Sequence, residues 1–157
     1  MMADRHQLNL TDVVAVALTA KTTATLPPRW RGDYTEHRAN QWIADRDAES
    51  ATLLAVDQRS GQAVGFLILF ETTHDDAPGI DLRIGYIITE AASGEGMASE
   101  LVDGLVDWAR ARSSIRSISG GVAVGNAASA RVLTKNGFTP AAGPSGDERI
   151  YELRIND

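Results

Sequence analysis

An apolar run at residues 84–88 leads into two glycines, Gly94 and Gly96, and a clear helical pattern follows them. The helix is predicted over residues 96–112, because its apolar side chains recur as an i, i+4, i+8 stripe. The first four N–H groups of a helix lack an internal partner and carry the positive end of the helix dipole. A loop without side chains lets a phosphate approach these donors closely. The stretch therefore indicates either a phosphate-binding loop or a plain tight turn.

The rest of the chain alternates predicted strands and helices. Strands are expected at residues 6–10, 52–57, 62–73, 80–89, 114–124, 137–141 and 148–155, and helices at residues 13–20, 36–49, 96–112 and 126–136. A turn at residues 59–61 and a polar turn cluster at residues 74–79 make the central strands a meander. The order predicts an α+β (α/β) fold with a mixed, mostly antiparallel sheet rather than a doubly wound one.

Side chains that favour helix ends support these boundaries. Thr11 and Asp12 are the expected caps of the first helix, although its β-branched content leaves a strand open. Asn126 is the expected N-cap of the last helix, and Gly137 is its expected C′ residue.

Length and composition exclude several classes of function. The 157 residues fit a single domain, residues 1–157, and a net charge of −6 argues against nucleic acid as a partner. The absence of cysteine excludes disulfides, thiolate metal sites and a cysteine nucleophile. No leader-like or membrane-length apolar run occurs, so no membrane partner and a cytoplasmic location are expected.

Two well-known phosphate loops fit the glycine stretch poorly. A Walker A loop needs Lys and then Ser or Thr after its glycine, whereas Met97 and Ala98 follow Gly96. A dinucleotide fingerprint needs a third Gly or Ala, where this chain has Ser99. It also needs an acidic residue at the end of the next strand, which ends near Val124 without one.

A third pattern matches at two places in the right order. Residues 93–98 occupy the places of the motif Arg/Gln-x-x-Gly-x-Gly/Ala, and a second motif is matched by Asn126, Ser129, Gly137 and Phe138. Together these segments resemble the GNAT N-acetyltransferase superfamily, most closely the branch with ribosomal-protein N-terminal acetyltransferases. The clear resemblance covers about residues 80–140.

The resemblance implies a central sheet flanked by helices, with a splayed strand pair that holds a cofactor, acetyl-CoA. Its pyrophosphate would lie on the backbone amides of Ser93, Gly94, Glu95, Gly96, Met97, Ala98 and Ser99. Its pantetheine arm would run beside the strand whose last residues are Ile87, Ile88 and Thr89. Asn126 and Ser129 would contact the cofactor from the last helix. For Asn126 a simple capping role is the alternative, and the two roles are compatible.

The chain departs from the family pattern at three positions. Ser93 replaces the usual Arg or Gln, and Glu95 places a carboxylate between the glycines, so weaker cofactor affinity is predicted. Leu133 stands where many members place a Tyr that protonates the departing thiolate. The general acid is therefore unassigned.

The resemblance implies direct transfer of an acetyl group to a primary amine, with a backbone amide of residues 87–89 stabilising the oxyanion. Glu71 is the first candidate for general base and Tyr86 the next, as acid or substrate contact, followed by Glu90 and His74. The alternatives are ordinary: solvated charges at strand ends, core packing for Tyr86, and a loop histidine.

The acceptor is expected to be a protein N-terminus, a polyamine or another small amine. Residues 26–34, with Trp30, Arg31, Asp33 and Tyr34, either line its pocket or form a surface linker packed by one Trp. Trp42 and Trp108 are predicted to be core residues. A catalytically silent acyl-CoA-binding module, an unrelated phosphate-ligand protein, a homodimer and a longer acyl donor remain open.

Overall fold

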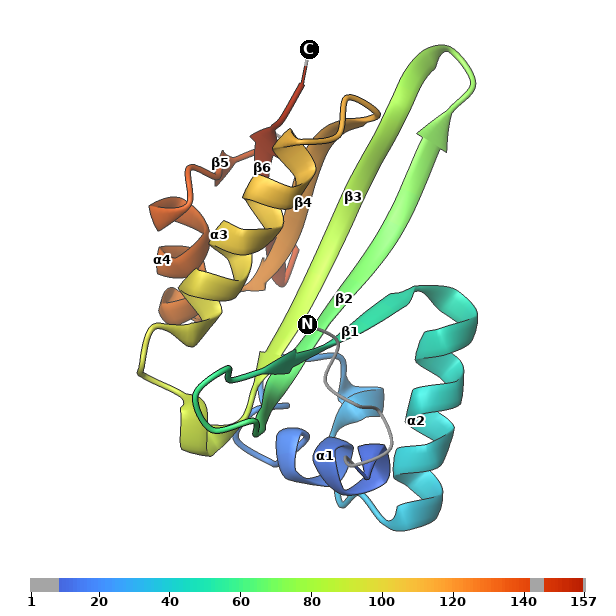
Figure 1. Cartoon of the computed structure of the whole chain (residues 1–157), viewed down its shortest axis with the longest axis vertical. Helices are drawn as coiled ribbons and strands as arrows, with labels where there is room; N and C mark the ends of the chain where they lie inside the picture. The colour runs from blue at the N-terminus through green and yellow to red at the C-terminus, as the bar shows by residue number, and fades with distance from the viewer. Residues whose placement is uncertain (1–8, 142–145, 157) are drawn as a thin grey trace. The chain divides into compact units, whose positions relative to one another are not determined.

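The six strands in the described part of this protein form one sheet in the order β1-β2-β3-β4-β6-β5 (Figure 1). The helices precede or connect these strands along the chain. The computed structural model describes residues 9–141 and 146–156. The helices are α1 (Leu10–Ala17), α2 (Glu36–Glu49), α3 (Met97–Arg110) and α4 (Ala127–Lys135), with 3₁₀ turns η1 (Pro28–Trp30) and η2 (Glu90–Ala92). The strands are β1 (Ala51–Val56), β2 (Ala63–His74), β3 (Ala77–Ile88), β4 (Ile115–Ala123), β5 (Thr139–Pro140) and β6 (Glu148–Arg154). The predicted α+β fold with a mixed sheet is confirmed.

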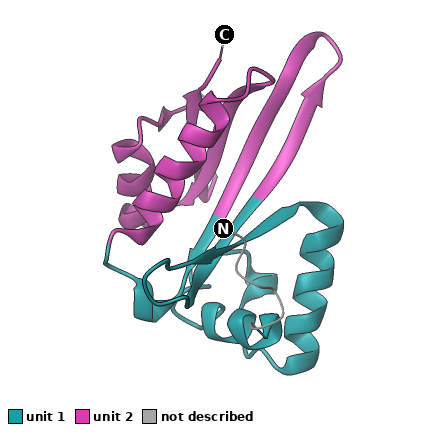
Figure 2. Cartoon of the chain, in the orientation of Figure 1, with its two compact units in different colours: residues 1–68, 86–95 teal, residues 69–85, 96–157 magenta. Residues whose placement is uncertain are grey.

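The chain divides into two compact units, drawn in teal and magenta in Figure 2. Unit 1 contains residues 1–68 and 86–95, and unit 2 contains residues 69–85 and 96–157. The division crosses β2 and β3, the two strands of the long hairpin, so each of these strands contributes to both units.

Unit 1 is built around α1 and α2, which pack against each other. Val14 and Ala17 of α1 and Ala39 and Trp42 of α2 are buried, as the helical spacing of these positions requires. Trp42 meets Phe66 of β2 at a ring-centroid distance of 5.4 Å, so the helix layer joins the sheet through aromatic contact. The predicted burial of Trp42 is confirmed.

Unit 2 contains the parallel pair of the sheet. β4 pairs in parallel with β3 from Ile80/Ile115 to Ile84/Gly120, and antiparallel with β6. The alternation along β4 buries Ile118 and Val122, while α4 packs against this strand and against α3. The amphipathic stripe of α3 is confirmed by its buried residues Val102, Leu105, Val106 and Ala109.

Local capping signals account for the ends of α4. Asn126 accepts a hydrogen bond from the amide of Ser129 at 3.2 Å, which confirms the predicted N-cap. At the other end Gly137 has φ +90°, and the amides of Gly137 and Phe138 bond to the carbonyls of Thr134 and Leu133. This is a Schellman motif, so the predicted C′ glycine is confirmed as well.

Several predictions about elements were wrong. Leu10 begins a helix instead of ending a strand, because Asn9 caps α1 by accepting from the amides of Thr11 and Asp12. Residues 6–8 of that predicted strand lie outside the described part of the chain. The predicted turn at residues 74–79 is also too long, since β2 runs to His74 and β3 starts at Ala77.

Trp108 is not a core residue. Its exposed fraction is 40%, and the Arg112 guanidinium lies 4.1 Å from the centre of its ring. Trp108 lies at the margin of the apolar stripe of α3. Its ring is partly covered by the guanidinium of Arg112, one turn further along, in a cation–π contact.

Candidate functional site

The last residues of β3 are held by a very close approach to β2 within unit 1. A Cβ on Gly65 would collide with the carbonyl oxygen of Ile87, so only glycine fits at position 65. Nearby, the amide of Thr89 donates to the carbonyl of Val64 at 2.8 Å. Residues 87–89, predicted to line the cofactor, are therefore fixed in register against β2.

Gly65 was missed as a site-forming residue. The available signal was an isolated glycine within an apolar strand, which indicates a bulge or a close backbone approach. The partner of that approach lies 22 positions along the chain and could not be read from the pattern.

A short 3₁₀ turn, η2, connects β3 to the glycine loop. The amide of Ser93 donates to the carbonyl of Glu90 at 3.2 Å, so this predicted phosphate donor is already engaged. The Glu90 carboxylate accepts a 2.7 Å hydrogen bond from the Thr19 hydroxyl. Glu90, a lower-ranked candidate base, is thus tied to the segment that follows α1.

The two glycines of the loop have the left-handed backbone that favours glycine. Gly94 has φ +82° and Gly96 has φ +78°, and a Cβ at either position would meet no atom within 4 Å. Gly96 is the N-cap of α3 and carries no side chain to accept from the amides of the first turn. The amides of Met97, Ala98 and Ser99 are therefore the donors that the helix start offers to a ligand.

Within unit 2, one side chain links α3 to α4. Nδ2 of Asn136 lies 3.3 Å from both the carbonyl and the hydroxyl oxygen of Ser99, and 2.9 Å from the Val132 carbonyl. This amide therefore connects the first turn of α3 to the end of α4, the helix that carries Asn126 and Ser129. Sequence analysis missed the role of Asn136, because the signal is an ordinary polar residue at a helix end.

Leu133 is a core residue of unit 2. Its exposed fraction is 1%, and its Cδ1 atom would lie 3.3 Å from a Cβ placed on Gly120 of β4. The place of the missing Tyr is thus filled by an apolar side chain against the sheet, and no hydroxyl is available there.

The two leading catalytic candidates, Glu71 and Tyr86, belong to different units. Glu71 is exposed and lies on the part of β2 that belongs to unit 2. Tyr86 is half-buried on the part of β3 that belongs to unit 1. The catalytic roles of both residues stay predictions.

His74, another candidate, is held by a carboxylate in unit 2. Its Nε2 lies 2.9 Å from Oδ2 of Asp81, and Ser117 donates from Oγ to Oδ1 of the same residue at 2.7 Å. The hydrogen bond from Ser117, assisted by that from His74, lowers the pKa of Asp81 below its usual value of 3.8.

The segment of residues 26–34 uses its polar groups for internal contacts. Arg31 donates to the carbonyls of residues 23, 24 and 26, and the Tyr34 hydroxyl donates to the Trp30 carbonyl at 2.9 Å. The ring of Trp30 meets that of Trp42 edge to face at 5.8 Å. These contacts favour the packed linker over the acceptor pocket for Trp30, Arg31 and Tyr34. The carbonyl of Asp33 accepts a hydrogen bond from Arg38.

The residues at the loop suit a pyrophosphate in kind. They offer backbone donors at the start of a helix of 14 residues, beside glycines that leave open space. One feature disagrees: the exposed carboxylate of Glu95 lies between the glycines and brings like charge to the same place. The donor set therefore fits coenzyme A, and the weaker affinity expected from Glu95 stays a prediction.

Comparison with known protein families decides the assignment. The model of the acetyltransferase (GNAT) domain matches residues 6–139. The chain belongs to the GNAT acetyltransferase family. The predicted family is confirmed, and acetyl-CoA is the acyl donor that a GNAT domain implies.

Solved GNAT structures share the fold at low sequence identity. A ribosomal L7/L12 α-N-protein acetyltransferase in complex with coenzyme A is 19% identical, with a TM-score of 0.75, over 98% of this chain and 92% of that one. A spermidine N-acetyltransferase from Vibrio cholerae in complex with CoA and spermine is 14% identical, with a TM-score of 0.72, over 98% and 92%. A GNAT-family acetyltransferase from Bacillus anthracis is 15% identical, with a TM-score of 0.74, over 92% and 89%.

A search of the curated proteins found no match to this GNAT chain. Among the helices of residues 9–141 and 146–156, none is long and apolar enough to cross a membrane.

Proposed function

We propose that this protein transfers an acetyl group from acetyl-CoA directly to a primary amine, either a protein N-terminus or a small amine. The observation that carries the proposal is the glycine-capped start of α3, which offers backbone donors in a chain of the GNAT family. Solved structures of similar fold include enzymes named for a ribosomal protein and for spermidine. Both names point to amine acceptors, which is the class proposed here.

The pyrophosphate would rest on the loop and on the first turn of α3. The amides of Gly94, Glu95 and Gly96 and those of Met97, Ala98 and Ser99 are the donors, since the amide of Ser93 serves the 3₁₀ turn. Asn136 holds Ser99 in place from α4. Asn126 and Ser129 would contact the same ligand from the start of α4.

Ile88 is the residue of β3 that we assign to the oxyanion. The amide of Thr89 already donates to β2, and successive amides of a strand point to opposite edges. The amide of Ile88 therefore points to the edge of β3 away from β2. Bound acetyl-CoA would supply the thioester, and a fixed backbone donor at this edge would stabilise charge on its carbonyl oxygen.

Proton removal from the amine is assigned to Glu71, with Tyr86 as acid or substrate contact. Glu71 is exposed and can exchange a proton with solvent or through water. Glu90 and His74 are weaker candidates, because Thr19 and Asp81 already occupy their side chains.

Release of free CoA thiol is the direct test, and the protein itself contains no cysteine to add background. The protein would be incubated with acetyl-CoA and one of three additions: a peptide that begins with alanine, spermidine, or no amine. Mass spectrometry would then detect acetylated amine products. Amine-dependent thiol release with acetylated product is expected. Binding of acetyl-CoA without release on any amine would contradict the proposal.

That contrary result would support a second candidate, an acyl-CoA-binding module without chemistry. The observation that favours it is Leu133, which is buried and apolar where many GNAT enzymes place a hydroxyl. Thermal stability separates this module from a protein that binds no CoA. A ligand at 100 times its dissociation constant adds about 2.7 kcal/mol to the native state.

A further inference from the structure

Unit 1 contains a cavity of about 150 Å³ that the proposed transfer reaction does not use. Its wall comes from α1, α2, β1 and β2 and includes apolar side chains such as Leu54 and Phe66. Four polar side chains, Trp42, Arg46, Asp47 and Thr52, line the same cavity. None of these residues belongs to the glycine loop or to α4, so the cavity is a separate feature of the molecule.

Three of the residues that line the cavity carry buried polar atoms without a hydrogen-bond partner in the described part of the chain. Among the described residues, Nε1 of Trp42, Nε and Nη1 of Arg46 and Oγ1 of Thr52 have no hydrogen-bond partner. The side chain of Arg46 is only 5% exposed. Buried polar groups are nearly always paired, so several orphan donors beside one cavity indicate a missing acceptor.

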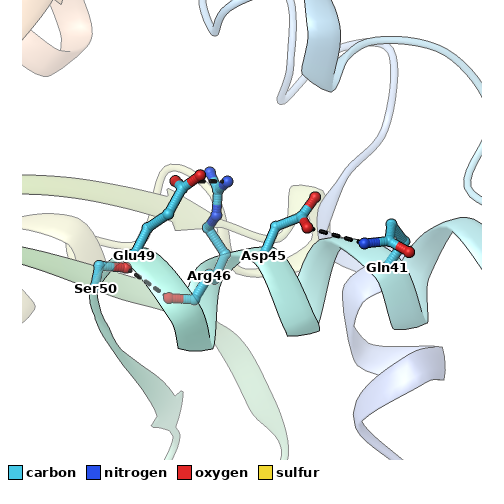
Figure 3. A network of polar contacts seen from close by, with 5 residues as sticks. All are labelled: Gln41, Asp45, Arg46, Glu49 and Ser50. Atoms are coloured by element: carbon cyan, nitrogen blue, oxygen red, sulfur yellow. Dashed lines mark hydrogen bonds and ion pairs between the residues drawn. The ribbon is translucent and has the colours of Figure 1, made fainter.

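The contacts that Arg46 does make leave these donors unused. Its Nη2 bonds to Oε2 of Glu49 at 3.0 Å, and Figure 3 shows the two side chains together on α2. Its guanidinium carbon lies 4.7 Å from the ring centre of Trp30 and 5.7 Å from that of Trp42. The rings attract the positive charge but offer no oxygen lone pair, and Glu49 is half exposed, so water screens its charge.

We propose that this cavity binds a small organic monocarboxylate. Its two oxygens would accept hydrogen bonds from Arg46, Trp42 and Thr52, and its apolar end would lie against Leu54 and Phe66. Asp47, an exposed carboxylate on the lining, disfavours a ligand with a second negative charge. An engineered cavity of about 150 Å³ takes up benzene, so a ligand of about six heavy atoms is the right size.

Butyrate is the probe, and the indole N–H resonance of Trp42 is the readout, in ¹H–¹⁵N spectra of the full chain. The indole of Trp108 serves as the internal reference, because it does not line the cavity, whereas the ring of Trp30 contacts both Trp42 and Arg46. Butyrate is expected to shift the Trp42 resonance saturably, with a dissociation constant below about 10 mM. Butyramide, neutral and of the same shape, and succinate, with two charges, are each expected to bind about tenfold more weakly.

Two variants test the donors. Arg46→Met is expected to abolish the butyrate shift, whereas Arg38→Met, on the same helix but outside the lining, keeps it. If Arg46→Met does not fold, Thr52→Val carries the test, with an expected loss of affinity of about three- to tenfold.

Three outcomes would overturn the proposal. The first is the absence of a saturable shift below about 50 mM butyrate, which would mean that the cavity holds only water. The second is equal binding of butyrate and butyramide. The third is a butyrate shift that is unchanged in both Arg46→Met and Thr52→Val, which would show that these donors do not bind the ligand. None of these readouts depends on acetyl-CoA, so failure here and failure of the proposed function are distinguishable.

Discussion

Gly65 of β2 and Ile87 of β3 approach so closely that a side chain at position 65 would collide with the carbonyl oxygen of Ile87. The contact lies next to the hydrogen bond between Thr89 and Val64, at the end of β3 that leads into the glycine loop. Because Gly65 has no side chain, the end of β3 can lie close against β2. The position of Ile88, the proposed oxyanion donor next to Ile87, therefore depends on Gly65.

Substitution Gly65→Ala is expected to lower the free energy of unfolding by about 1–3 kcal/mol, because backbone must shift to admit the methyl group. Affinity for acetyl-CoA should fall with it. Gly85→Ala in β3 is the matched control, since a Cβ there meets no atom within 4 Å. Urea unfolding and calorimetric titration would measure both, and equal effects of the two substitutions would refute the role of the close approach.

Gly96→Ala separates backbone cost from ligand binding. Gly96 and Gly61 both have positive φ, +78° and +70°, and neither would place a Cβ near another atom. Both substitutions are therefore expected to cost about 1–2 kcal/mol of stability. Only Gly96→Ala should weaken acetyl-CoA binding, and an equal loss of binding in Gly61→Ala would argue against the loop as the site.

Glu95→Gln is expected to strengthen acetyl-CoA binding, because it removes a carboxylate between the two loop glycines. An exposed charge near a pyrophosphate is worth about 0.5–1 kcal/mol, which is roughly two- to fivefold in affinity. The gain should shrink at high salt as screening increases. Asp103→Asn, an exposed acidic residue further along α3, is the control and should change affinity little. Unchanged affinity in Glu95→Gln would show that the carboxylate points away from the ligand.

Asp81 predicts a specific dependence of stability on pH. Hydrogen bonds from Ser117 and His74 lower the pKa of Asp81 in the folded protein below its usual 3.8, so the ionised carboxylate stabilises the fold above about pH 4. This contribution is lost as the pH falls through the lowered pKa.

Ser117→Ala removes the larger cause of that shift. The variant should be less stable than the parent near pH 7, and the difference should narrow on going toward pH 2. Ser119→Ala, two residues along β4, controls for the loss of a hydroxyl on this strand. Urea unfolding at several pH values would measure the difference, and a gap that stays constant with pH would exclude the linkage.

Local features of the sequence were sufficient for much of the fold. The stripe of α3, the Asn126 cap and the Gly137 terminus all depend on residues within a few positions of one another. Interactions of that range are encoded by spacing and by residue type, and so are the two motifs that place the chain in its family. The predicted start of α1 was wrong, because Asn9, which precedes the expected caps Thr11 and Asp12, is the residue that caps the helix.

Contacts between distant segments were decided only by the tertiary structure. The family, the order of most elements and the loop that is proposed to hold the pyrophosphate could all be predicted from local sequence patterns. The fold decided that Gly65 meets Ile87, that Asn136 contacts Ser99, and that Trp108 is exposed. The physical reason is that close packing and hydrogen bonding depend on which segments meet in space. The type of a residue does not show which distant residue it contacts in the fold.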